Sequence, residues 1–551
     1  MFHKSSKKQV IIRNYAFLFI MIVMFIGLAI RLVYVQLMEG PALSVSANEQ
    51  YYYEEDIDNI NFKLLDRNNE NIFYSQLKYY VVIDPITFYT LNEESAFIPM
   101  KNISYILRSH NKDYDISLLQ YEMENGNKQY EIDKECYEKL KSIEGVRGVY
   151  VYEYTEYKKN NDWNIKNILA SGVKYSDNSQ LKNEGTLERE IYEYTKNNKK
   201  KQIKLEKDVS GNIVNEVFND TGDNVNVVTT LDYKIQSKVE EILRSKSYEK
   251  YGQIGAIIME SDTGNILSMA QKDDGLSNVN IGIPSGDGFL LGSTFKTIVY
   301  EAALENGLIG EEEKFHLQGI FPKSIEKLGS YNMQQAYIAS SNDTFAQIGW
   351  KVGMDRIYEL SNRLGLFNKT LNLQDEKCGI IEGYKKENNL DIITNTSIGQ
   401  TVRATPLSAL AIPNTVVNRG KYIQPKIIDK VVNEKGEILK KYESVSRDAF
   451  SERTASIIKE GMLGVVRDEL GTGTNAKIDN LEVGGKTGTT EYFEGDKKCS
   501  DGWFTGFFNY KNKYYSMVIY LPQIEDVSGS SQVACSVFKD VIENLIKADY
   551  I

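Results

Sequence analysis

The chain has 551 residues, which at roughly 100 to 200 residues per domain predicts two or more domains. Hydrophobic residues make up 42% of it and aromatic residues 11%, which excludes a largely disordered chain. The formal net charge of −11 argues against a nucleic-acid-binding protein, because phosphate binding needs a basic surface. The sequence therefore predicts a folded, multidomain protein with no nucleic-acid partner.

An uncharged apolar segment lies near the N-terminus. It covers Tyr15–Ile30, and the apolar pattern continues past Arg31 to Val35. About 20 such residues cross a bilayer, so we predict a transmembrane helix over residues 15–35. Residues 1–14 are basic and lack acidic residues, which predicts a cytoplasmic tail and an extracellular remainder. A cleaved signal peptide is the alternative, but the apolar run is long and no small-residue cleavage site follows it closely.

Residues 36–225 are predicted to form an α+β domain. Alternating runs at Tyr79–Ile83 and Val149–Tyr154 are typical of half-buried strands, and charged, helix-like sequence separates them. Turn-forming residues gather around 208–223, which places a domain boundary near 225. No chemistry is visible in this region.

Residues 226–551 have a different pattern. Ile254–Met259 and Asn265–Ala270 are typical of a hairpin, and two further strands are predicted over Gly502–Phe508 and Tyr514–Leu521. A helix is predicted over residues 532–547. This order indicates one sheet covered by helices.

Three short patterns occur in order within this second region. They are Ser293-Thr294-Phe295-Lys296, Ser340-Ser341-Asn342, and Lys486-Thr487-Gly488 followed by Thr489. Taken singly, the first two are weak signals, because Ser-x-x-Lys and Ser-x-Asn recur elsewhere in the chain. Their order and setting carry more weight, since Ser293 stands at the start of a predicted helix and Lys486 opens a predicted strand.

The residue types in these patterns suit nucleophilic catalysis. Residues i and i+3 of a helix share a face, so Lys296 can place its amine beside the hydroxyl of Ser293. A serine hydroxyl needs a nearby base, and a desolvated, neutral lysine can be that base. The chain has only 3 histidines, and none lies near a Gly-x-Ser-x-Gly elbow, which argues against a Ser-His-Asp triad.

The other motif residues have matching candidate roles. The hydroxyl of Ser340 can shuttle a proton, and the amide of Asn342 can hold a substrate carbonyl. Lys486 is expected to supply a fixed positive charge for a substrate carboxylate. The candidate substrate-binding residues beside it are Thr487, Gly488 and Thr489. Their two hydroxyls can bind the same carboxylate, and the glycine leaves room for a substrate strand.

With these motifs the chain resembles the class B penicillin-binding proteins, which are monofunctional peptidoglycan D,D-transpeptidases. Further segments resemble the same family: Thr229–Asp232, Glu260–Ala270, Ser397–Gln400, Thr405–Leu407 and Trp503–Phe507. The resemblance covers essentially the full chain and is strongest from residue 226. It is weaker before that, where Leu64–Asn68 and Asp84-Pro85 resemble the family's pedestal domain.

The resemblance implies an α+β fold in four parts. These are a cytoplasmic tail (1–14), a transmembrane helix (15–35), an elongated pedestal or dimerisation-like domain (36–225) and a transpeptidase domain (226–551). The last part is expected to have the penicillin-binding and serine β-lactamase-like fold, an antiparallel sheet covered by helices with an all-α subregion. No cofactor and no metal are implied.

The resemblance also implies a role for each motif residue. Ser293 would attack the penultimate D-Ala carbonyl of a stem peptide and release the terminal D-Ala, with Lys296 as general base. Ser340 and Asn342 would relay protons and position the peptide. The substrate carboxylate would be held by Lys486, Thr487 and Thr489, and the backbone amides of Ser293 and Thr489 would form the oxyanion hole.

The implied partners are peptidoglycan stem peptides, β-lactams as inhibitors, the membrane, a separate glycosyltransferase and cell-wall assembly proteins. A β-lactamase and a non-catalytic β-lactam sensor or scaffold are the alternative functions. Two departures from the family pattern bear on this reading. Leu291-Gly292 replaces the usual Pro-Gly before the nucleophile, and Asn61–Leu65 replaces the usual Arg-Gly before the pedestal's Asp-Arg-Asn. They put in doubt the shape of the helix start and the partner contacts of the pedestal.

The 4 cysteines are too few and too scattered for a disulfide framework or a zinc finger. Cys499 follows Lys486 by 13 residues, so it is expected near the same cleft. A metal site there would draw on Asp496, Asp501, Cys378 or His316. Free thiols are the favoured interpretation, because these residues are scattered in the sequence.

Overall fold

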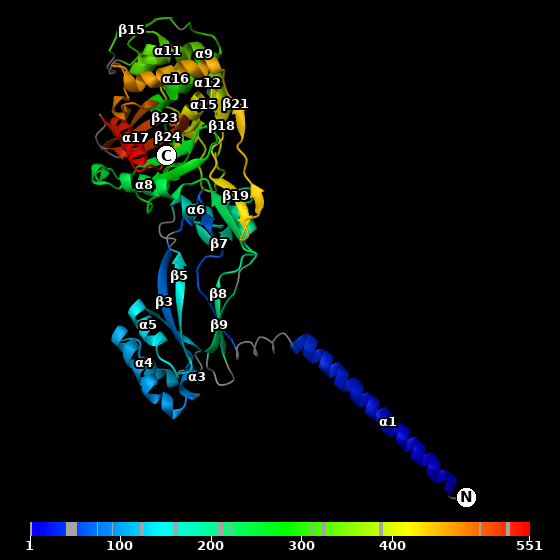
Figure 1. Ribbon diagram of the computed structural model, residues 1–551. Coiled ribbons are helices and arrows are strands. Elements are labelled where there is room, and N and C mark those ends of the chain that lie inside the picture. The colour runs from blue at the N-terminus through cyan, green and yellow to red at the C-terminus, as the bar shows by residue number, and fades with distance from the viewer. Residues whose placement is uncertain are drawn as a thin grey trace. The chain divides into compact units, whose positions relative to one another are not determined.

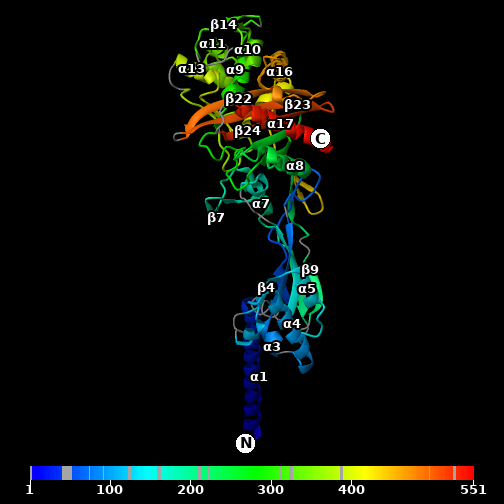
Figure 2. The ribbon, with the colours of Figure 1, turned by 90° about the vertical axis from the view of Figure 1, so that its left-hand side faces the viewer.

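A computed structural model describes residues 3–39, 52–73, 75–90, 92–121, 126–157, 163–207, 213–219, 222–310, 312–321, 327–384, 389–494, 497–524 and 529–551. The chain divides into two compact units, each made of three segments (Figure 1, Figure 2). The first unit contains Met1–Asn61, Ser75–Tyr157 and Lys199–Thr221. The second unit contains Phe62–Tyr74, Lys158–Asn198 and Gly222–Ile551.

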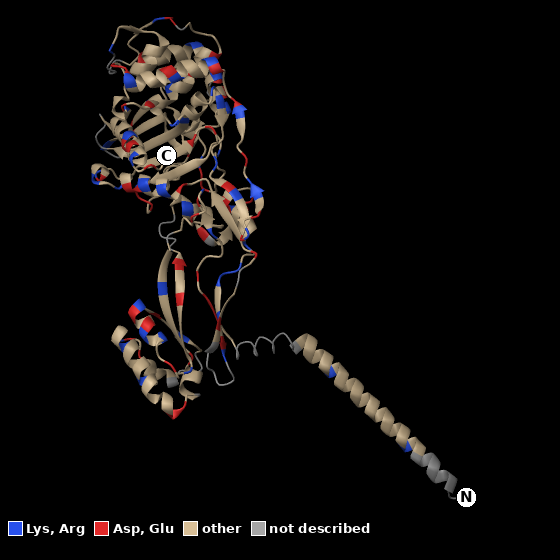
Figure 3. Cartoon of the chain, viewed as in Figure 1, with Lys and Arg blue, Asp and Glu red and all other residues tan. Residues whose placement is uncertain are grey.

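The first unit begins with helix α1 (His3–Tyr34), followed by a short π-helical turn (Val35–Glu39). Its apolar stretch Ile11–Met38 is long enough to cross a membrane, and none of it is buried. Helix α1 carries the basic residues Arg13 and Arg31 within this stretch and contains no acidic residue, as the colours of Figure 3 show. The predicted segment 15–35 lies inside this stretch. Length and composition alone fit a membrane anchor and a signal sequence equally.

The rest of the first unit contains two three-stranded sheets. One has the order β4 (Lys128–Ile132), β3 (Ser75–Ile83), β5 (Val149–Tyr157), and the other β1 (Tyr52–Asp56), β8 (Gln202–Lys207), β9 (Ile213–Asn219). Val81 and Ile83 of β3 pack with helices α4 (Phe97–His110) and α5 (Lys134–Lys141). Val82, on the opposite face, packs with β8. Because successive strand residues point to opposite faces, the end of β3 at residues 81–83 is buried on both sides.

The second unit is built on a five-stranded antiparallel sheet with the order β12-β11-β24-β23-β22. The strand bounds are β11 (Gly255–Glu260), β12 (Ile266–Gln271), β22 (Glu482–Glu494), β23 (Lys497–Tyr510) and β24 (Lys513–Ile524). Helices α8 (Tyr233–Leu243) and α17 (Ser530–Lys547) pack on the face that carries Phe504 and Phe508. The predicted antiparallel sheet with covering helices is confirmed. The last strands are longer than predicted because β22 and β23 pair along their whole length.

A helical region covers the other face of this sheet. It contains α9 (Lys296–Glu305), α10 (Met333–Ala339), α11 (Asn342–Val352), α12 (Met354–Arg363), α13 (Leu390–Ser397), α15 (Ala411–Val417) and α16 (Glu452–Arg467). In Figure 2, α9, α10 and α11 lie above β22 and β23, while α8 lies below. The motif residues come from the boundary between this region and β22. This arrangement matches the expected sheet with an all-α subregion.

The two units are interleaved in the sequence. Strand β2 (Leu64–Leu65) pairs in parallel with β10 (Val225–Thr229) of the second unit. Arg67, just after β2, donates a hydrogen bond to Glu260 at 2.8 Å. Residues 62–74 and 158–198, which the sequence analysis assigned to one contiguous pedestal, therefore fold as part of the second unit. The four domain ranges remain a prediction from the family resemblance.

Candidate active site

Ser293 lies on a short 3-10 turn, η6 (Gly292–Phe295), that runs directly into α9. Gly292 has a φ of +52°, and a Cβ added there would lie 2.5 Å from the carbonyl oxygen of Thr489. The glycine thus allows η6 to press against β22. Ser293 is half-buried, whereas its neighbours on both sides are buried.

Leu291, which stands where the family usually has proline, has a structural role of its own. Its backbone N–H donates to the carbonyl of Val402 at 2.9 Å, and the next N–H, from Gly292, donates to the carbonyl of Gly399 at 3.1 Å. A proline has no N–H and cannot make the first of these bonds. Gly399 has a φ of +78°, and a Cβ there would overlap the carbonyl of Gly292. The start of the helix is therefore held by backbone contacts.

Lys296, one turn after Ser293, is completely buried. Its Nζ donates to the carbonyl oxygen of Ser340 at 2.6 Å, to the Oγ of Ser340 at 3.2 Å and to the Oδ1 of Asn342 at 2.6 Å. These acceptors compensate for the loss of water around the amine. The first two predicted motifs are therefore joined through this one side chain.

Ser340 occupies the sharp turn between α10 and α11. Its backbone is left-handed, with φ 58° and ψ 35°, which costs a non-glycine residue about 1 kcal/mol or more. The turn brings the side chains of Ser340 and Asn342 to the same amine. The Oγ of Ser340 also accepts a hydrogen bond from the Nζ of Lys486 at 3.0 Å. One hydroxyl therefore lies between two lysines.

Lys486, on β22, is also completely buried. Besides Ser340, its Nζ contacts the carbonyl of Thr487 at 3.4 Å. Burial lowers the pKa of Lys486 from its usual value of 10.5 to about 7. The sequence analysis expected a fixed positive charge here. With a pKa near neutral, this amine can gain or lose a proton around pH 7.

The residues that follow Lys486 lie at the junction with η6. The hydroxyls of Thr487 and Thr472 lie 2.7 Å apart, while Thr489 is half-buried like Ser293. A Cβ on Gly488 would lie 2.7 Å from the carbonyl oxygen of Leu291 and 2.8 Å from Thr294. The glycine therefore has a packing role between β22 and η6, in addition to the room for substrate that the sequence suggested.

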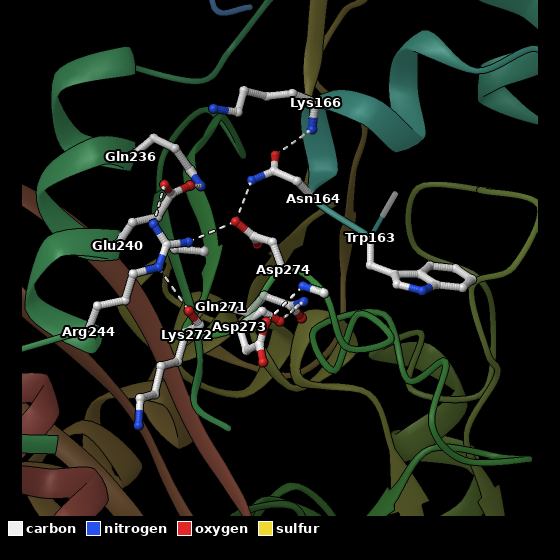
Figure 4. A network of polar contacts seen from close by, with 12 residues as sticks. Trp163, Asn164, Lys166, Gln236, Glu240, Arg244, Gln271, Lys272, Asp273 and Asp274 are labelled. Atoms are coloured by element: carbon white, nitrogen blue, oxygen red, sulfur yellow. Dashed lines mark hydrogen bonds and ion pairs between the residues drawn. The ribbon is translucent and has the colours of Figure 1, made fainter. Parts of the chain in front are cut away.

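A polar network holds the loop that leads from β12 toward Ser293 (Figure 4). Asp274 accepts hydrogen bonds from Asn164 at 3.0 Å and from Arg244 of α8 at 2.7 Å. Asn278, four residues further along the loop, donates to the carbonyl of Trp163 at 2.8 Å. Residues from the segment 163–198 thereby support the approach to the nucleophile within the second unit.

The cysteines do not gather into a metal site among the described residues, where no group of three or more potential ligands occurs. Cys499 is buried, and Asp501 accepts hydrogen bonds from Tyr492 and Tyr520 instead. His316 is exposed on the short strand β14 (Phe315–His316). Asp496 lies outside the described residues.

Sequence reasoning missed three residues that shape this site. Thr472 contacts Thr487, Gly399 packs on Gly292, and Tyr337 lies beneath Lys486. Gly399 stands in a segment that already resembled the family, but its role was not apparent. Thr472 and Tyr337 carry no local signal, because their roles depend on contacts between distant parts of the chain.

Comparison with known families decides the assignment. The penicillin binding protein transpeptidase domain matches residues 254–543, more than half of the chain. The chain belongs to the penicillin-binding protein transpeptidase family. This matched region contains all three motifs.

Individual curated proteins also have sequences similar to that of this penicillin-binding protein domain. The chain is 26% identical over 350 residues to Stage V sporulation protein D of Bacillus subtilis (strain 168), covering 59% of this chain and 53% of the relative. It is 26% identical over 286 residues to the probable peptidoglycan D,D-transpeptidase FtsI of Caulobacter vibrioides, covering 48% and 46%. The chain thus spans about half the length of the curated relatives it matches.

The fold also matches a solved structure. A peptidoglycan synthetase from Bifidobacterium adolescentis aligns with a TM-score of 0.63 and 16% identity, over 91% of this chain and 97% of that one. At this identity the likeness concerns the fold alone. It includes the segments before residue 254 that the family domain does not match.

Proposed function

We propose that this chain is a membrane-anchored peptidoglycan D,D-transpeptidase. The observation that carries the proposal is the convergence of the motifs: Lys296 and Lys486 both donate to the hydroxyl of Ser340, and Ser293 lies one turn before Lys296. A serine nucleophile, a buried amine and a hydroxyl relay are the parts that acyl transfer needs. Family membership supports the same reading.

The proposed reaction has two steps, acylation of Ser293 and transfer of the acyl group to an amine. The Oγ of Ser293 attacks the penultimate D-Ala carbonyl of a stem peptide, and Lys296 in its neutral form takes the hydroxyl proton. The C–N bond to the terminal D-Ala breaks, and that amine leaves with a proton relayed through Ser340. An amine of a neighbouring stem peptide then attacks the acyl ester and restores the serine hydroxyl. A β-lactam would acylate the same oxygen by opening its ring.

The remaining site residues have supporting roles. Asn342 positions the peptide, and Thr487, Thr489 and Lys486 bind the substrate carboxylate, which would favour the charged form of this lysine. The backbone amides of Ser293 and Thr489 stabilise the oxyanion. Gly488 keeps the strand close to η6. No step requires a cofactor or a metal.

The location and partners follow from the same reading. One apolar N-terminal helix supports anchoring in the membrane by a single span. The basic residues before it favour a cytoplasmic N-terminus and an extracellular catalytic region. A separate glycosyltransferase would supply the glycan strands, within a group of cell-wall assembly proteins.

The test uses the full-length chain in detergent with a fluorescent penicillin. The expected result is an adduct that persists for hours, maps to Ser293 by peptide mass spectrometry, and is absent from Ser293→Ala. Ser285→Ala, a serine in the preceding loop that bonds the carbonyl of Gly282, is the matched control and should retain the adduct. Rapid loss of the adduct would indicate a β-lactamase, and no adduct would indicate a non-catalytic scaffold.

A further inference from the structure

Each of the two buried lysines of the site has its amine near the face of an aromatic ring. The Nζ of Lys486 is 5.7 Å from the ring centre of Tyr337, and the Nζ of Lys296 is 5.6 Å from the ring centre of Phe345. The two rings neighbour each other, with centres 6.4 Å apart. An ammonium group within about 6 Å of a ring face is attracted by the ring's electron density, most strongly away from water. We call Tyr337 and Phe345 the aromatic floor.

Tyr337 is fixed in place from several sides. Its hydroxyl is hydrogen-bonded to the Oγ1 of Thr297 at 2.9 Å, and Thr297 is the residue after Lys296. Its ring packs on Tyr300 of α9, with centres 5.4 Å apart. On α16, a Cβ at Gly461 would lie only 3.0 Å from the ring, so the glycine is needed for this close approach. The ring therefore cannot move away from Lys486 without disturbing two helices.

The groups around Lys486 leave its charge without a carboxylate partner. Within the described part of the chain no ion pair joins Lys486 to an acidic residue. Glu301 of α9 is fully buried, both its carboxyl oxygens lack hydrogen-bond partners among the described residues, and burial raises its pKa well above the usual range. On α17, burial likewise raises the pKa of the Cys535 thiol, and on α16, Lys459 is paired with Glu482. The amine of Lys296 donates a hydrogen bond to the same hydroxyl of Ser340.

We infer that Tyr337 is a positioning residue for Lys486: its ring favours the charged form of the buried amine and holds that amine in contact with Ser340. The proposal rests on the proposed function, because the charge matters for binding the substrate carboxylate. It adds a residue outside the three motifs. Tyr337 does not touch the substrate, so it acts through Lys486.

The experiment measures the acylation rate of the full-length chain by fluorescent penicillin from pH 5.5 to 10. Tyr337→Phe keeps the ring, so its profile should follow that of the unmodified chain. Tyr337→Leu removes the ring. In the plot of acylation rate against pH, the change in rate caused by titration of Lys486 should then move to lower pH by about half to one unit. A loss of packing alone would lower the rate equally at every pH.

A second series keeps the test decisive if Tyr337→Leu does not fold. Substitution of Tyr337 by phenylalanines with one, two and three ring fluorines withdraws electron density at nearly constant shape. A shift to lower pH that grows with each fluorine supports the inference. Superimposable profiles across the series would overturn it. Absence of any Ser293 adduct in the unmodified chain is a distinct result, which would contradict the proposed function instead.

Discussion

Lys486 reaches from β22 to the end of α10, where its Nζ lies 3.0 Å from the Oγ of Ser340. These residues are 146 positions apart in the chain. Lys296 donates to the same oxygen from α9. The hydroxyl therefore connects two buried amines, and a proton can pass between them without entering water.

Removal of this hydroxyl tests the relay. We expect Ser340→Ala to lower the rate of acylation by penicillin roughly 100- to 10,000-fold, the usual contribution of general acid–base catalysis. Ser340→Gly removes the same hydroxyl and also relieves the left-handed backbone, so it should be more stable than the alanine variant by about 1 kcal/mol. Equal activity of the two variants, with different melting temperatures, separates the hydroxyl from the backbone. Near-normal acylation in either variant would contradict the relay.

The buried amine of Lys486 predicts a pH-dependent stability. Its pKa is about 7 in the folded chain and 10.5 when unperturbed, so between these values the unfolded state binds more protons. The free energy of unfolding should therefore rise with pH over this window, by about 1 kcal/mol per unit. Thermal unfolding of the unmodified chain and of Lys486→Met, from pH 6 to 10, checks this. If the lysine is the cause, the difference in unfolding free energy between Lys486→Met and the unmodified chain should become smaller as the pH rises. Parallel plots of unfolding free energy against pH for the two proteins would refute the prediction.

Gly488→Ala tests the contact between β22 and η6. The new methyl group would press on the carbonyl of Leu291 and on Thr294, and must push Ser293 away from the strand. We expect about 1 to 3 kcal/mol of destabilisation and a roughly 100-fold slower acylation. Gly329→Ala is the matched control, since nothing lies within 4 Å of its Cβ. Unchanged acylation in Gly488→Ala would show that η6 is not held by this approach.

Glu260 predicts a stability effect at acidic pH. Burial alone would raise the pKa of its carboxyl, but hydrogen bonds from Lys513 and Arg67 hold that pKa at about 2. The carboxylate's contribution is complete above the unperturbed value of 4.5 and is lost as the pH falls toward 2. Arg67→Met should therefore lower stability at pH 7 by about 1 to 2 kcal/mol, a figure reduced by the partial exposure of the arginine.

The comparison for Arg67→Met is a titration of unfolding from pH 7 to 2. The free energy of unfolding of Arg67→Met should be lower than that of the unmodified chain at pH 7, and this difference should become smaller below pH 4.5. Lys539→Met, which breaks an exposed pair with Glu543 on α17, should change stability little at any pH. A deficit that stays constant down to pH 2 would mean that Arg67 acts through packing rather than through the carboxylate.

Much of the fold could be predicted from local patterns. The strand at 149–154 alternates, the hairpin at 254–270 turns at Gly264, and the terminal helix has a clear apolar face, so each is visible in a short window. The strand at 79–83 was expected to be half-buried, but its last three residues are buried on both faces. The lengths of β23 and β24 were underestimated, because strand length depends on pairing with a neighbour. Segments 62–74 and 158–198 group with the second unit rather than with the rest of residues 36–225. This grouping was not apparent from the sequence, because it depends on contacts with distant parts of the chain.

The short, ordered motifs were enough to select the candidate reactive groups, namely the serine, the two lysines and the amide. The spacing of Ser293 and Lys296 also predicts a shared helix face, because residues i and i+3 of a helix lie one turn apart. The surroundings of those residues became visible in the folded chain. It placed Ser340 between two amines, removed water from Lys486, and set Tyr337 beneath it. Solvation and contacts between distant segments govern proton affinity, and neither is encoded in any single stretch of the chain.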